Sequence, residues 1–205
     1  MGGPGNDWLD GGEGLDWAFF DGNRSDYLIQ IDPSVITVTR QALLANTAAS
    51  KPPSASIDRD QLQGVERAQF DDVTVVFSND PHGLWAARLL GLFAGASAFS
   101  DRKTAGRVVA LLDAGYSFEL LAQAAADVFI QPKAPLSMLI GHLLRNLLPS
   151  PPQAFVLDAI TKDCESAGLS VSDVVRLAGD LAITDDLIQL SGIQTIGWSV
   201  ILPGG

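Results

Sequence analysis

The sequence predicts an α+β protein, with a short N-terminal β-roll-like and β-hairpin region followed by an all-α domain of two repeated three-helix units. Three observations lead to this prediction. The chain starts with two glycine-rich repeats, continues with short β-branched runs, and from residue 81 carries apolar residues at helical spacing. We therefore expect two domains, covering residues 1–80 and 81–205.

The first two dozen residues contain one nine-residue pattern twice in succession. Residues 2–10 (GGPGNDWLD) and 11–19 (GGEGLDWAF) both fit G-G-x-G-x-D-x-U-x, where U is apolar, and no gap separates them. Glycine permits tight turns with positive φ, so each G-G-x-G stretch predicts a turn. Leu9 and Ala18 at the U positions are expected to point into a narrow core between strands. Residues 20–28 lack the double glycine and break the pattern.

The paired repeats resemble the Ca²⁺-binding β-roll repeat of bacterial RTX proteins. The resemblance implies that each ion lies between turns on the same side of the roll, so that one site draws on repeats two apart. Ca²⁺ takes about six to eight oxygen ligands, and turn carbonyls with aspartate carboxylates can supply part of that shell. A complete site then needs more than these two repeats. The candidate ligands are Gly3, Gly5, Asn6, Asp7, Gly12, Gly14 and Asp16. The alternative is a flexible leader rich in glycine and aspartate.

Residues 20–80 are predicted to be β-structure. The runs 27–31 and 35–39 are β-branched and are separated by Asp32-Pro33-Ser34, which predicts a hairpin. A connection exposed to solvent is expected over residues 45–60. Residues 62–77 then predict further strands, with a turn at Asp71-Asp72. This last block resembles the strand pair that commonly follows the last RTX repeats. Adjacent turn residues point apart, so we do not assign Asp71 and Asp72 as a general acid and base.

The chain from residue 81 onward is predicted to be helical and internally repeated. Expected helices run from about 84 to 92, from an Asp101 cap to 112, and from a Ser117 cap to 128, and a second set follows over 136–147, 153–167, 171–181 and 185–190. Residues 114–117 (AGYS) match residues 167–170 (AGLS) at a spacing of 53. Such repeated units bury their apolar stripes against each other.

This helical repeat resembles a domain of uncharacterised function that follows RTX repeats in many secreted bacterial proteins, including S-layer-associated ones. The resemblance covers most of residues 84–200. The loops at 96–102 and 149–152 depart from the usual pattern, so a binding role of those loops in the family does not carry over to this chain.

Composition excludes several classes of function. A net charge of −11 argues against nucleic-acid binding, which needs clustered Lys and Arg. One cysteine, Cys164, excludes an intramolecular disulfide. No stretch is long and apolar enough to predict a membrane span, and the first 20 residues do not read as a signal peptide. In the resembling proteins, type I export reads a C-terminal signal instead. The apolar tail, Trp198 and residues 200–205, is either such a signal or a segment docked on the helical domain.

No catalytic residue is predicted, and we expect that the protein is not an enzyme. His82 and His142 do not have metal-binding spacing, and Cys164 lies between two acidic residues, which makes it a poor candidate for a nucleophile. No G-x-S-x-G motif and no P-loop occur. The preferred hypothesis is a calcium-binding module of a secreted or cell-surface bacterial protein, which folds on extracellular Ca²⁺ and serves export, surface attachment or assembly. The alternatives are a calcium-independent helical protein-interaction domain and an accessory domain of a secreted hydrolase.

Overall fold

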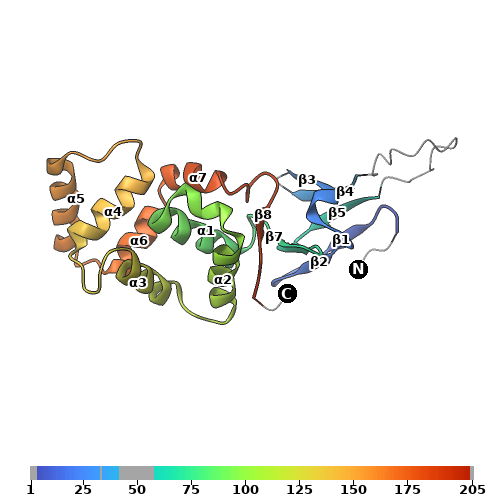
Figure 1. The fold of residues 1–205 in the computed structure, drawn as a ribbon, viewed down its shortest axis with the longest axis horizontal. Coiled ribbons are helices and arrows are strands. Elements are labelled where there is room, and N and C mark those ends of the chain that lie inside the picture. The colour runs from blue at the N-terminus through green and yellow to red at the C-terminus, as the bar shows by residue number, and fades with distance from the viewer. Residues whose placement is uncertain (1–3, 33, 42–57, 204–205) are drawn as a thin grey trace. The chain divides into compact units, whose positions relative to one another are not determined.

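The computed structural model describes residues 4–32, 34–41 and 58–203, and Figure 1 shows the fold. Gly3, Pro33 and most of the connection expected over residues 45–60 lie outside these ranges, as do the last two residues of the tail. The chain forms two compact units, and each is described by itself. The first contains Met1–Asp80 with Gly192–Val200, and the second contains Pro81–Ser191 with Ile201–Gly205.

The first unit, which we call the β unit, consists of two four-stranded sheets. One sheet has the strand order β1-β5-β4-β3, and the other has the order β2-β6-β7-β8. Their bounds are β1 Trp8–Asp10, β2 Trp17–Phe19, β3 Tyr27–Asp32, β4 Val35–Arg40, β5 Arg59–Gln63, β6 Arg67–Gln69, β7 Thr74–Val76 and β8 Trp198–Val200, with a 3₁₀ turn η1 at Arg24–Asp26.

The glycine repeats form the first turn of a roll. β1 lies parallel to β5 in one sheet, with Leu9 opposite Leu62, and β2 lies parallel to β6 in the other, with Ala18 opposite Ala68. Successive strands of the roll therefore alternate between the sheets, and β5 with β6 forms its second turn. The predicted β3–β4 hairpin is confirmed and lies between the two turns in sequence.

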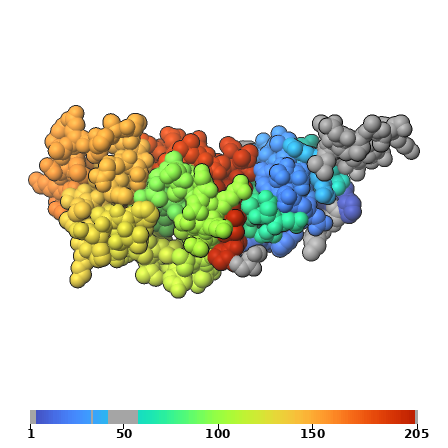
Figure 2. All heavy atoms as spheres, viewed as in Figure 1, coloured from blue at the N-terminus to red at the C-terminus, as the bar shows by residue number. Residues whose placement is uncertain are grey.

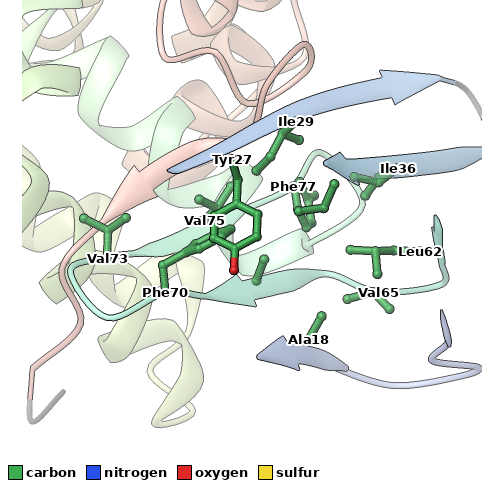
Figure 3. Close-up of a cluster of buried hydrophobic side chains, with 12 residues drawn as sticks. Ala18, Tyr27, Ile29, Ile36, Leu62, Val65, Phe70, Val73, Val75 and Phe77 are labelled. Carbon is green, nitrogen blue, oxygen red and sulfur yellow. The ribbon is translucent and has the colours of Figure 1, made fainter. Parts of the chain in front are cut away.

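The core of the β unit lies between the two sheets (Figure 3). Ala18 is 4% exposed, and Leu9 packs against the same cluster, as the repeat pattern predicts. The remaining buried members come from strands β3 to β7 and the residues that adjoin them: Tyr27, Ile29, Ile36, Val38, Leu62, Val65, Ala68, Phe70, Val73, Val75 and Phe77.

The C-terminal tail differs from the expectation. Strand β8 pairs antiparallel with β7, placing Trp198 opposite Val76, and Trp198 is 2% exposed. Residues 192–200 thus belong to the β unit, and the prediction that this part of the tail docks on the helical domain is wrong. This pairing needs glycine at residue 197, because a Cβ on any other residue there would lie only 2.2 Å from Val75 Cγ1.

The second unit, which we call the helical unit, contains the seven predicted helices in the predicted order. Their bounds are α1 Pro81–Ala94, α2 Arg102–Asp113, α3 Phe118–Phe129, α4 Leu136–Leu147, α5 Ala154–Ser166, α6 Val171–Gly179 and α7 Ala182–Gln189, with a 3₁₀ turn η2 at Ala96–Ser100. Helix α1 is central and packs against α2, α3, α4, α6 and α7. No helix in the described ranges has the length and apolarity that crossing a membrane requires.

The repeated A-G-x-S stretches have the same backbone conformation. Gly115 and Gly168 have φ values of 86° and 66°, and each follows a helix whose last turn it closes. Ser117 and Ser170 then cap the next helices, their side chains accepting the N–H groups of Leu120 and Asp173. The equivalence of these caps supports the internal repeat that the sequence predicts.

Candidate metal site

The loops that join the strands of the roll stack on one another. Residues 11–16 join β1 to β2, and residues 64–66 join β5 to β6. The Gly11 N–H group donates to Gln63 O at 2.9 Å, and a Cβ on Gly11 would lie 2.1 Å from Gly64 O. Because only glycine allows two backbones to approach this closely, the first glycine of the second repeat is needed for stacking.

Asp16 connects these two loops through its backbone. Its carbonyl accepts the N–H groups of Glu66 and Arg67 at 3.2 and 3.1 Å, and its own N–H group donates to Glu66 Oε2 at 2.9 Å. One oxygen of its carboxylate has no hydrogen-bond partner: Asp16 Oδ2 is buried and accepts no hydrogen bond from the residues that the structure describes. A buried carboxylate oxygen without a donor is costly unless a cation compensates it.

Asp7 repeats this arrangement nine residues earlier. Its N–H group donates to Asp60 Oδ1 at 3.0 Å, and its carbonyl accepts the N–H group of Gln61 at 2.9 Å. Asp7 Oδ2 is likewise buried and has no donor among the described residues. Each repeat aspartate is therefore paired with a carboxylate of the second roll turn, Asp60 for Asp7 and Glu66 for Asp16.

The two second-turn carboxyl groups have raised pKa values. Burial is the largest cause of the raised pKa of Asp60 and of Glu66, and the N–H group that each accepts partly offsets it. The negative charge of Asp7 raises the pKa of Asp60 further, and that of Asp16 does the same for Glu66. A cation beside either pair would stabilise the ionised form of both carboxyl groups.

The structure places the two predicted aspartates in different loops, bonded to different residues of the second turn. In the described ranges, no three His, Cys, Asp or Glu side chains come together as a metal-binding group. A cation at the Asp7–Asp60 pair or the Asp16–Glu66 pair would therefore take two carboxylates and complete its shell with backbone carbonyls. Ca²⁺ accepts such a mixed oxygen shell.

The other predicted ligands belong to the turns around these pairs. Gly5, Gly12 and Gly14 have φ values of 121°, 87° and 123°, which agree with turns that favour glycine. Asn6 Oδ1 accepts the Arg59 N–H group at 2.9 Å, so its side chain already links the two roll turns. Gly3 lies outside the described residues.

Sequence reasoning missed Asp60, Glu66 and Gly64 as the second half of the site. The sequence predicts only strands over residues 62–77 and an exposed connection over residues 45–60. A weak signal was present, because Gly64-Val65-Glu66 repeats the order glycine, apolar, acidic found in Gly14-Leu15-Asp16.

Asp71 and Asp72 fix a third loop. Asp71 Oδ2 accepts the Gly22 N–H group at 3.0 Å, and Asp72 Oδ1 accepts the Arg24 N–H group at 2.7 Å. In all three loops of the roll, second-turn carboxylates accept N–H groups from the first turn.

The remaining titratable candidates form contacts within the helical unit. His82 Nδ1 lies 2.8 Å from Asp113 Oδ1, which links α1 to α2. His142 Nε2 lies 2.8 Å from Phe93 O, which links α4 to α1. Cys164 is partly buried on α5. These contacts are of the kind that hold helices together.

No protein-family model, curated protein or solved structure matches this chain. The resemblance to RTX repeats therefore stays a prediction from the sequence.

Proposed function

We propose that this chain is a non-catalytic calcium-binding module of a secreted or cell-surface bacterial protein. One observation carries the proposal: Asp7 Oδ2 and Asp16 Oδ2, at equivalent positions of two glycine repeats, are buried without a donor among the described residues. Each belongs to a residue hydrogen-bonded to a second carboxylate, and each lies beside a glycine turn whose carbonyls can add oxygen ligands.

Calcium acts by coupled folding. Without the ion, the Asp7–Asp60 and Asp16–Glu66 pairs bring like charges together, and the glycine turns lose much conformational entropy on ordering. Binding of Ca²⁺ removes the repulsion and stabilises only the folded roll, so its binding free energy adds to the folding free energy. The millimolar calcium outside cells suits a site of the weak affinity typical of extracellular modules, with a Kd of about 10⁻⁴–10⁻³ M.

The RTX resemblance adds two parts to this proposal. The chain is exported through a type I system, and it serves surface attachment or assembly, including with S-layer proteins. The residues that support both parts are the consecutive repeats and the helical repeat that follows them. The helical unit then serves as the part that meets other proteins.

Calorimetric titration with Ca²⁺ and thermal melting test the proposal. We expect saturable calcium binding, and at ten times the Kd a stabilisation of the β unit by about 1.4 kcal/mol. For a domain of this size, about 1 kcal/mol corresponds to a melting shift of roughly 4–8 °C.

Two double variants provide the comparison. Asp7→Ala/Asp16→Ala should abolish both the heat and the melting shift, whereas Asp158→Ala/Asp163→Ala removes the same charge from α5 and should change neither. If the wild-type chain shows no heat and no shift up to several times the calcium concentration outside cells, the proposal is wrong.

A calcium-independent protein-interaction domain remains the second candidate, because the helical unit exposes large apolar side chains. Val128 is 78% exposed, Phe155 is 69% exposed and Leu190 is 67% exposed. If the wild-type chain does not bind calcium in the titration although its helical unit is folded, this alternative is favoured.

A further inference from the structure

Helix α4 lines a cleft together with residues from the end of α3 and the first turns of α5. Helix α4 contributes five residues that recur mainly at intervals of three and four and so share one face: Ser137, Met138, Gly141, His142 and Arg145. The cleft has a volume of about 430 Å³ and is open to solvent. This volume lies within the range of small-molecule sites, which is about 300–1,000 Å³.

The walls of the cleft are mainly apolar. Phe129 and Ile130 come from the end of α3, and Leu157 comes from the first turns of α5. Helix α5 lies at the surface of the helical unit (orange in Figure 2), and Thr161 is its one buried residue. The side chains of Phe129 and Met138 remain 46% and 44% exposed, so the cleft offers apolar surface that no described residue covers.

Gly141 forms part of the cleft because it has no side chain. A Cβ at this position would lie 3.5 Å from Leu157 Cδ2, which is an ordinary van der Waals contact. Gly141 is therefore not required by close packing of α4 on α5. It also lowers the stability of the helix relative to alanine. The space that it leaves open lies against the wall formed by α5.

Arg145 supplies the cleft with one cation. Its side chain is exposed and forms no ion pair with any described residue, whereas Arg88 and Arg176 in the same unit are paired with Asp180 and Glu119. The planar guanidinium fork of Arg145 matches a carboxylate with two parallel hydrogen bonds.

His142 lines the cleft and is held to α1 by a hydrogen bond. Its Nε2 lies 2.8 Å from Phe93 O, a contact in which the ring nitrogen donates its hydrogen to the carbonyl. Arg145 remains the permanent charge among the residues that line the cleft.

We propose that this cleft binds a small apolar monocarboxylate, with its apolar body against Phe129, Met138 and Leu157 and its carboxylate on Arg145. The apolar walls provide the binding area, and the guanidinium determines the sign of charge that the ligand carries. This site lies in the helical unit and is independent of the calcium proposal.

Octanoate is a suitable probe, and octan-1-ol and octylammonium are matched controls of the same chain length. The full chain is titrated with each while amide chemical shifts are recorded. Octanoate should produce saturable shifts at Gly141 and His142. Octan-1-ol should bind at least about tenfold more weakly because it lacks the charge that pairs with arginine, and octylammonium should not saturate.

Three variants locate the site. Arg145→Gln should weaken octanoate binding about tenfold or more, whereas Lys162→Gln, an exposed cation on α5, should leave it within about twofold. Gly141→Ala narrows the cleft and favours the helix, so it should weaken binding without unfolding the chain. Absence of saturation with octanoate, equal binding of octan-1-ol, or unchanged affinity in Arg145→Gln or Gly141→Ala would each overturn the proposal.

Discussion

The β unit and the helical unit use carboxylates in opposite ways. In the β unit, Asp60 and Glu66 are partly or largely buried beside another aspartate, and burial raises their pKa values. In the helical unit, Asp101 and Asp173 are exposed at the starts of helices, where hydrogen bonds from Thr104 and Ser170 lower their pKa values.

This difference in burial determines which unit can respond to its surroundings. An exposed carboxylate that accepts hydrogen bonds at a helix N-terminus is already satisfied, and it gains little from a cation. A buried pair of carboxylates is costly until a cation or a proton reaches it. We therefore expect the β unit to respond to calcium and pH near its carboxyl pKa values, and the helical unit to be indifferent to calcium.

The greatest loss of stability is expected from a change in the buried ion pair of the β unit. Arg67 Nε and Asp80 Oδ2 lie 2.6 Å apart, both side chains are 0% exposed, and the Trp17 ring lies 5.1 Å from the guanidinium carbon. Asp80→Ala should destabilise the β unit by about 3–5 kcal/mol, because it removes a carboxylate from beside a buried charge. Urea unfolding combined with hydrogen exchange of the β6 and β7 amides measures this loss.

The double variant Arg67→Met/Asp80→Leu is the control, since it removes both charges and keeps apolar volume. It should cost clearly less than Asp80→Ala. If both variants cost the same, the loss comes from packing and not from an uncompensated charge. If the helical amides lose as much protection as the β6 and β7 amides, the two units do not respond separately.

The sequence predicts the helical unit more completely than the β unit for a physical reason. Helix caps and apolar stripes are local, so Ser117, Ser170 and the glycines before them can be recognised within a few residues. The β unit depends on pairing between distant segments, such as Trp8 with Gln61 and Thr74 with Val200.

The candidate site is only partly predictable for the same reason, because its residues are far apart in the sequence. Asp7 and Asp16 follow from the repeat pattern, but their partners Asp60 and Glu66 lie about 50 residues away, beyond an intervening hairpin. Strands of three residues, such as β6 and β8, carry too little periodicity to reveal which sheet they join. Only the parallel register of the folded roll brings the two halves together.

Two glycines, one in each unit, are required for different reasons: one because a side chain would clash, the other because its backbone has a positive φ. In the β unit, Gly11→Ala places a Cβ against Gly64 O and should cost about 1–3 kcal/mol through forced displacement of the loops. In the helical unit, Gly115 has φ 86° and nothing within 4 Å of an added Cβ, so Gly115→Ala should cost only about 1 kcal/mol of backbone strain. Thermal melting of both variants, with and without calcium, provides the measurement.

Gly11→Ala should also reduce the stabilisation by calcium, because the loop that holds Asp16 moves. Gly115→Ala should leave that stabilisation unchanged. Equal calcium responses in the two variants would show that loop stacking does not shape the site.

The smallest and most diagnostic effect is the dependence of stability on pH. For Asp60 and Glu66 the pKa in the folded chain lies above the ordinary values of 3.8 and 4.5, so the folded state binds more protons than the unfolded state. Without calcium, the stability of the β unit should therefore fall as pH rises from about these values through the raised pKa values. For Asp101 and Asp173 the sign is reversed: their stabilisation is present above 3.8 and is lost as pH falls through the lowered pKa values.

Hydrogen exchange and melting in the presence of a chelator, recorded from neutral to acidic pH, measure both responses in one chain. Mild acidification should stabilise the β unit and leave the helical unit unchanged, and Glu66→Gln should reduce the response of the β unit because its amide does not titrate. Saturating calcium should invert the response of the β unit, since protons then compete with the ion for the same carboxylates. A chelated β unit that becomes more stable as pH rises would show that Asp60 and Glu66 are already compensated within the chain, and calcium would then have no buried repulsion to relieve.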